Sequence, residues 1–92
     1  MTVKVRWSRK ALDELRGQVA YIARDNEAAA LRVADAINLA GERLGKLSTG
    51  RPGRQAGTYE KLVPRLPYIL VYGIDENTVT ILRVIHTARD WP

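Results

Sequence analysis

The segment ILRVIHTARDWP, residues 81–92, brings several reactive residue types close together in the chain. Arg83 and the only histidine, His86, lie three residues apart, and Arg65 lies in an earlier connection between two expected strands. Cleavage of a phosphodiester needs proton-transfer groups for the nucleophile and the leaving oxygen, and cations that stabilise the phosphorane. An imidazole with two guanidinium groups could supply these roles, so phosphoryl chemistry is the first reaction to consider.

Length and composition limit what can position these residues. Ninety-two residues predict a single domain, 1–92, and the absence of cysteine excludes disulfides and thiolate metal sites. No run is apolar and long enough to span a bilayer, and the first ten residues alternate apolar and basic types, unlike a signal peptide. We therefore expect a soluble cytoplasmic protein with no membrane contact, metal or cofactor.

The net charge of +5 is concentrated in two places. Residues 1–10 carry four basic and no acidic residues, and residues 48–65 carry four basic residues against one acidic residue. Eleven of the fifteen basic residues are arginine, whose planar group suits carboxylate and phosphate partners. The composition therefore predicts an acidic partner, of which nucleic acid is only one kind.

The first half of the chain predicts a strand and two helices. Residues 2–7 alternate apolar and polar side chains as a half-buried strand does, and Ser8 is placed to cap a helix over about 9–24. Asp25 and Asn26 interrupt the pattern and supply a second cap, and apolar residues at spacings of three and four predict a second helix over about 27–47. The basic residues near the start, which we interpret as the solvent face of an edge strand, are Lys4, Arg6, Arg9 and Lys10.

The second half predicts a loop followed by three strands. Residues 48–58 are rich in glycine and are expected to form a surface loop. The runs 59–63, 67–74 and 78–85 predict a meander, in which Arg83 interrupts the apolar face of Val79, Ile81 and Ile85. The expected fold is α+β with the order β-α-α-β-β-β, a helical hairpin packed on a small, mostly antiparallel sheet.

At this level of detail the chain resembles a known family. The loop GRPGR (50–54), the run PYILVYGID (67–75) and the ending ILRVIHTARDW (81–91), in this order, look like the ParE/RelE toxins of type II toxin–antitoxin systems, and specifically the ParE branch. The resemblance implies a RelE-like fold, a ParD-like antitoxin as partner and a role in plasmid or chromosome stabilisation. It also implies DNA gyrase as the target for the ParE branch, or ribosome-bound mRNA for the RelE branch.

The residues separate these two activities better than the fold does. RelE-like nucleases keep cations on the sheet and usually a tyrosine or histidine near the C-terminus, so Arg83, His86 and Arg65 are the catalytic candidates if the chain is a nuclease. Against this reading, no tyrosine follows Tyr72, and Asp90 would repel a phosphate. We therefore expect a non-enzymatic gyrase inhibitor with no catalytic residue, and keep the ribosome-dependent endoribonuclease as the alternative.

The remaining candidates are binding residues. Arg51 and Arg54 lie among glycines, where a solvated loop is the structural alternative. Arg83 could equally pair with a carboxylate inside the fold, and Arg89 could form a local ion pair with Asp90. His86 and Trp91 could serve structure by closing the core. The candidate contacts for target or antitoxin are Arg51, Arg54, Arg83, Arg89 and Trp91.

The resemblance also implies how the partners meet. We expect a hetero-oligomer in which an antitoxin lays an amphipathic helix over apolar surface left by the hairpin and sheet, with acidic residues facing the arginines. A third reading is a non-toxic DNA-binding or scaffold protein drawn to DNA by its basic excess. Since no recognition helix is evident in the sequence, direct nucleic-acid binding is not expected.

Overall fold

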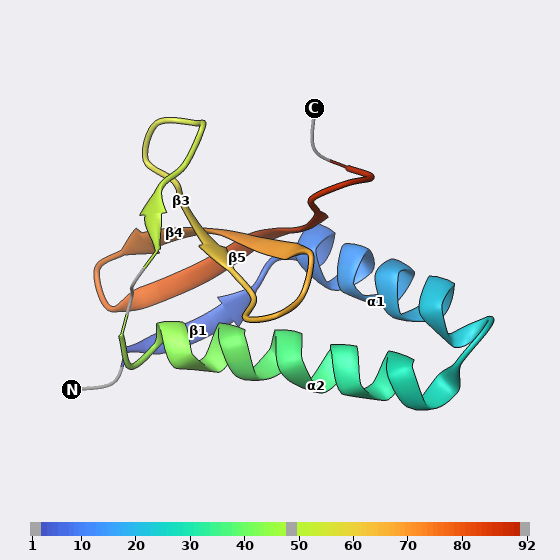
Figure 1. The fold of residues 1–92 in the computed structure, drawn as a ribbon. Helices are drawn as coiled ribbons and strands as arrows, with labels where there is room; N and C mark the ends of the chain where they lie inside the picture. Colours follow the sequence, from blue (N-terminus) through green and yellow to red (C-terminus); the bar gives the residue numbers. More distant parts are fainter. Residues whose placement is uncertain (1–2, 48–49, 91–92) are drawn as a thin grey trace.

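The chain folds into two layers, a five-stranded sheet and a pair of helices (Figure 1). The computed structural model describes residues 3–47 and 50–90. The elements are β1 (Lys4–Trp7), α1 (Arg9–Ala23), α2 (Glu27–Leu44), β2 (Arg51–Pro52), β3 (Tyr59–Leu62), β4 (Tyr68–Asp75) and β5 (Thr78–His86). This is the predicted α+β architecture, with β2 as an addition. In the described part of the chain, neither helix is long and apolar enough to cross a membrane.

The sheet is mixed, with the strand order β1-β5-β4-β3-β2. β1 runs parallel to β5, and the remaining neighbours are antiparallel. Lys4 and Arg6 on β1 are exposed, which confirms an edge strand with a charged outer face. Arg9 was wrongly grouped with them, because it already begins α1, where Lys10 follows it.

Both helices begin at capping residues that the sequence predicts. The Ser8 hydroxyl accepts the Ala11 N–H at 3.0 Å, and the Asn26 side chain accepts the Ala29 N–H at 3.0 Å. The second helix ends at Leu44, one turn before the predicted end, because the chain turns there through Gly45. A Cβ at Gly41 would lie 2.5 Å from the Trp7 ring, so glycine lets α2 approach the sheet closely.

The last two strands contain a β-bulge that changes the predicted faces of β5. Val71 lies opposite Arg83 while Tyr72 lies opposite Ile81, so Leu82 is the extra residue. Val79, Ile81 and Val84 join the core beneath the helices, whereas Arg83 and Ile85 lie on the other side of the sheet. The prediction that Arg83 shares a face with Val79 and Ile81 is therefore wrong, because the extra residue reverses the alternation. We call this other side, which α1 borders at Lys10 and Glu14, the helix-free face.

The stretch predicted as a loop contains a short strand that the core holds in place. β2 pairs with β3 through Arg51 opposite Glu60 and Pro52 opposite Tyr59. The buried Tyr72 hydroxyl accepts the Gly50 N–H at 2.9 Å, and the Tyr72 ring stacks on Tyr59 with centroids 5.5 Å apart. Burial raises the pKa of Tyr72, so the hydroxyl stays neutral and the contact is retained.

Candidate protein-binding site

Arg83 is held by a carboxylate of the first helix. Its Nε and Nη2 atoms donate to Glu14 Oε2 at 3.0 and 2.7 Å, and Glu14 Oε1 also accepts the Val84 N–H at 3.0 Å. The hydrogen bonds that Arg83 donates to the Glu14 carboxylate raise the pKa of Arg83. Because β1 ends at Trp7, Glu14 supplies the acceptor that a longer β1 would have given to the edge of β5. The pair with a carboxylate, one of the two alternatives considered for Arg83, is therefore present.

His86 serves as a backbone acceptor at the end of β5. Its Nδ1 atom accepts the N–H groups of Ala88 at 3.1 Å and Arg89 at 3.2 Å, and its ring meets Tyr68 edge to face at 5.2 Å. The Nδ1 lone pair of His86 is therefore engaged by the backbone of the following turn. This arrangement agrees with the structural role considered for His86.

The residues after His86 fold back onto the first helix. Gln18 donates to Asp90 Oδ2 at 2.8 Å and accepts from Arg89, whose guanidinium carbon lies 4.3 Å from the centroid of the Tyr21 ring. The Asp90 carboxylate also accepts the His86 N–H at 2.9 Å, and this bond lowers the pKa of Asp90. Arg89 is therefore tied to α1 rather than to Asp90. Trp91 lies outside the described residues.

The three candidates for a nuclease site are not brought together. Arg83 lies on the helix-free face, whereas His86 pairs with Tyr68 in the row of side chains that faces the helices. Arg65 lies in the β3–β4 connection, where its φ of 65° marks a tight turn. Two cavities among the described residues are lined by Arg83, and neither is lined by His86 or Arg65. The same part of the chain holds no cluster of three or more potential metal ligands.

The loop arginines lie close to a buried carboxylate. Glu60 is only 6 % exposed, and its Oε1 atom lies 4.0 Å from Arg51 Nη2 while its Oε2 atom accepts the Arg54 N–H at 3.2 Å. Arg51 and Arg54 are themselves exposed. The register places Arg51, Glu60, Val71 and Arg83 in one cross-strand row. The two candidate arginines that belong to strands, Arg51 and Arg83, therefore share the helix-free face.

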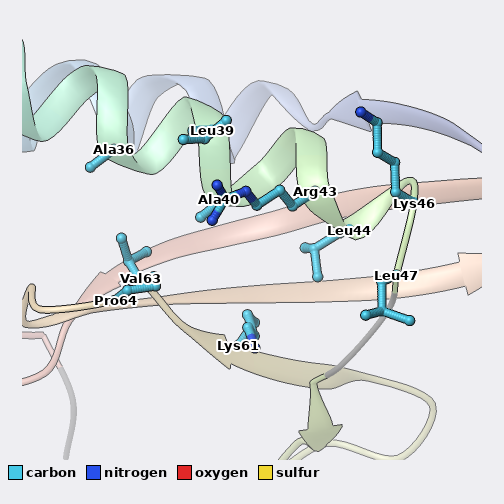
Figure 2. Close-up of a pocket in the computed structure, with 10 residues that line it drawn as sticks. All are labelled: Ala36, Leu39, Ala40, Arg43, Leu44, Lys46, Leu47, Lys61, Val63 and Pro64. Atoms are coloured by element: carbon cyan, nitrogen blue, oxygen red, sulfur yellow. The ribbon is translucent and has the colours of Figure 1, made fainter.

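An apolar groove between α2 and β3 was not found from the sequence. Its cavity volume is about 350 Å³, and Figure 2 shows side chains of the helix and the strand on its two sides. Leu39 is 48 % exposed and Leu47 is 69 % exposed, which is costly for large apolar side chains in a monomer. The basic residues that line the groove are Arg43, Lys46 and Lys61. The available signal was a second apolar stripe on the helix, formed by Ala36, Leu39 and Ala40 at spacings of three and four.

The fold is shared with solved structures, two of which come from toxin–antitoxin systems. A structure of the chromosomal ParDE system from P. aeruginosa matches 92 % of this chain and 96 % of its own, with a TM-score of 0.85 and 20 % identity. The toxin–antitoxin complex RelBE2 from Mycobacterium tuberculosis matches 94 % and 92 %, with a TM-score of 0.60 and 28 % identity. The YoeB dimer from Staphylococcus aureus matches 90 % and 94 %, with a TM-score of 0.56 and 14 % identity. The protein therefore has the RelE/ParE-like fold.

Sequence comparison narrows this class to one branch. The family model described as "ParE toxin of type II toxin-antitoxin system, parDE" matches residues 5–91. The "Putative toxin Y4kP" of Sinorhizobium fredii (strain NBRC 101917 / NGR234) is 39 % identical over 90 residues, which cover 97 % of this chain and 93 % of that protein. The chain belongs to the ParE family of toxins from type II toxin–antitoxin systems.

Proposed function

We propose that this ParE-family toxin inhibits DNA gyrase by protein–protein binding and performs no chemical step of its own. The observation that supports the proposal is that the acid–base candidates of the toxin do not converge on one site. Arg83 is engaged by Glu14 on the helix-free face, while the His86 Nδ1 atom accepts two backbone N–H groups near the opposite face. A nuclease needs such groups converging on one phosphate. The surfaces that remain are suited to binding, and we place this activity in the cytoplasm.

A ParD-like antitoxin is the proposed occupant of the apolar groove. An amphipathic helix with an apolar stripe would cover Leu39 and Leu47, and its acidic residues would meet the basic residues that line the groove. Burial of two large aliphatic side chains is worth about 1.5–3 kcal/mol each, so the toxin should be more stable in a hetero-oligomer with its antitoxin. The ParDE and RelBE2 origin of the matched structures supports a partner of this kind.

The exposed arginines are the proposed contacts for an acidic surface of the target. Arg51, Arg54 and Arg83 lie on or beside the helix-free face, and Arg89 lies at the adjoining tail. We also propose that Trp91 contributes a contact, on sequence grounds alone. Arg89 already stacks on Tyr21, so its side chain is held in place before any partner arrives.

A gyrase supercoiling assay tests the function directly. Purified toxin should inhibit supercoiling of relaxed plasmid or accumulate cleaved DNA, and an equimolar amount of antitoxin should reverse the effect. Normal supercoiling at a large excess of toxin over gyrase would contradict the proposal. Heat-denatured toxin and the preformed toxin–antitoxin complex are the matched controls.

Ribosome-dependent mRNA cleavage is the second candidate function, because the Arg83 side chain stays partly exposed beside a cavity on the sheet. It predicts mRNA fragments in translating extracts and their loss in both Arg83→Ala and His86→Ala. Growth arrest that survives both substitutions without mRNA fragments would exclude it. A non-toxic DNA-binding protein would instead leave growth normal and bind duplex DNA with a strong dependence on salt.

A further inference from the structure

The helix-free face contains a cavity that the groove proposal does not use. Its volume is about 320 Å³, and it lies where the β2–β3 loop, the middle of the sheet and the first turn of α1 meet. Val71 and Ile85 supply apolar lining from β4 and β5. The cationic side chains that line it come from three separate segments of the chain, Lys10, Arg54 and Arg83. We call this cavity the basin.

The carboxylates of the basin already have partners. Glu60 accepts the Arg54 N–H and faces Arg51 from its buried position in β3. Glu14 lies behind Arg83 and is 21 % exposed. The two acidic groups are thus engaged from within the fold, while three cationic side chains line the space that a ligand would enter. The charge of that space favours an anionic group.

Arg83 is held in one orientation by Glu14. The carboxylate engages the edge of the guanidinium formed by Nε and Nη2, and it is itself fixed by the Val84 N–H. The hydrogen bonds that the Arg83 side chain donates to Glu14 come from Nε and Nη2 and do not use Nη1. A guanidinium fixed in this way loses little freedom when it binds a second anion, so Glu14 acts as a positioning residue for Arg83.

The chemistry of the basin favours a protein ligand over RNA. A run of phosphates would lie near both Glu14 and Glu60 and would be repelled by their charges. A single carboxylate beside an apolar side chain meets less of this repulsion, because it can approach the cations while its neighbour covers the partly exposed Val71. No histidine or tyrosine of the described residues lines the basin, and the Glu60 carboxylate that does line it already accepts the Arg54 N–H and faces Arg51.

The basin and the groove lie on opposite sides of the sheet. Along β3, Lys61 lines the groove and Glu60 lines the basin, and successive residues of a strand point to opposite faces. We infer that the basin is the surface through which this toxin engages a carboxylate-bearing, partly apolar patch of its target protein, separately from the antitoxin groove. This inference rests on the proposed toxin function, and it implies that antitoxin in the groove does not by itself cover the target contact.

Charge reversal in the basin tests this inference in living cells and with purified proteins. Lys10→Glu and Arg54→Glu place a negative charge at its rim, and Lys4→Glu makes the same change on the distant end of β1. Each full-length variant is induced alone to measure growth arrest, and with tagged antitoxin to measure co-purification. The basin variants should restore colony formation by about 100-fold and still co-purify with antitoxin, whereas Lys4→Glu should behave as wild type.

The possible outcomes distinguish two questions, whether the basin is the contact surface and whether gyrase is the target. Arrest that persists in both basin variants, loss of antitoxin binding together with arrest, or a wild-type chain that does not arrest growth would each overturn the inference. Loss of mRNA fragments in parallel with loss of arrest would overturn it in favour of RNA. Basin-dependent arrest with normal gyrase supercoiling would instead remove gyrase as the target and leave the basin as the contact surface.

Discussion

The apolar groove and the basin differ in how far the fold has already satisfied their side chains. In the groove, Leu39 and Leu47 stay largely exposed, and only a partner can remove them from water. In the basin, Arg83 is paired with Glu14, and the carboxylate of Glu60 is engaged from β2 and the following loop. Covering the exposed leucines of the groove would therefore contribute free energy to binding. The ion pairs of the basin instead stabilise the fold without any ligand.

This difference separates the two kinds of recognition. Apolar burial is proportional to area and has little directional preference, so the groove suits a partner that must bind tightly. Fixed charges add orientation and selectivity more than affinity, so the basin suits a target that must be distinguished from other acidic proteins. Substitutions in the groove should accordingly change antitoxin affinity, and substitutions behind the basin should change stability.

The largest expected effect is on antitoxin affinity. Leu39→Glu introduces a charge into the apolar groove and should weaken binding of a ParD-like antitoxin by at least about 100-fold. Leu31→Glu on the same helix is the matched control, because Leu31 is 66 % exposed and lies outside the groove lining. Isothermal titration calorimetry should find the control within about threefold of wild type. Equal affinities for all three proteins would show that the antitoxin binds elsewhere.

The second-largest effect is expected on the free energy of unfolding and concerns Glu14, the partner of Arg83. Glu14→Gln removes the charge that pairs with Arg83 and should lower the free energy of unfolding by about 2 kcal/mol. Asp13→Asn on the same helix should cost less than about 0.5 kcal/mol, because its contacts with Arg9 and Arg16 are exposed and at least 3.5 Å long. Urea denaturation measures both. If the two variants were equally stable, the pairing of Glu14 with Arg83 would not stabilise the fold.

The sequence predicted those features that depend on nearest neighbours along the chain. Alternation identified β1 as a half-exposed strand, and the Ser8 and Asn26 caps placed the starts of both helices. The strand order of the meander followed from its short turns. The family resemblance, carried by motifs that lie far apart in the chain, was confirmed by the match over residues 5–91.

Features that depend on distant segments were not predictable. The bulge at Leu82 arises from the register between two strands, so alternation in β5 alone assigned Arg83 to the wrong face. The partner of Arg83 lies 69 residues away, and no local pattern marks Glu14 among the acids of α1. The two residues of β2 lie in a glycine-rich stretch whose composition is typical of a loop, and they become a strand only beside β3.

A smaller effect is expected where the core holds the loop that carries Arg51 and Arg54. Tyr72→Phe removes the acceptor of the Gly50 N–H and should cost about 1 kcal/mol of stability while leaving the ring stacked on Tyr59. Amide hydrogen exchange should become faster at Gly50 and Arg51, but not in β5. Unchanged exchange there would mean that strand pairing alone holds the loop beside the basin.

The smallest effect is the pH dependence contributed by Asp90. Its pKa is lowered in the folded protein, first by the His86 N–H, so its ionised form stabilises the fold above the unfolded-state pKa of about 3.9. That contribution is lost as the pH falls through the lower folded-state value. Asp90→Asn should therefore be less stable than wild type at pH 7, and the difference in urea midpoint should shrink as the pH falls below about 4.

Substitution of a group that contacts the Asp90 carboxylate shows how much of the pH effect depends on that contact. Gln18 donates to the same carboxylate, so Gln18→Ala should reduce the Asp90 effect without abolishing it, because the His86 N–H remains. Asp75→Asn, which changes an exposed acid at the end of β4, is the matched control for the loss of one surface carboxylate. A difference between Asp90→Asn and wild type that persisted unchanged at pH 2.5, far below the ordinary carboxyl pKa of about 3.9, would assign the stabilisation to the shape of the tail rather than to its charge.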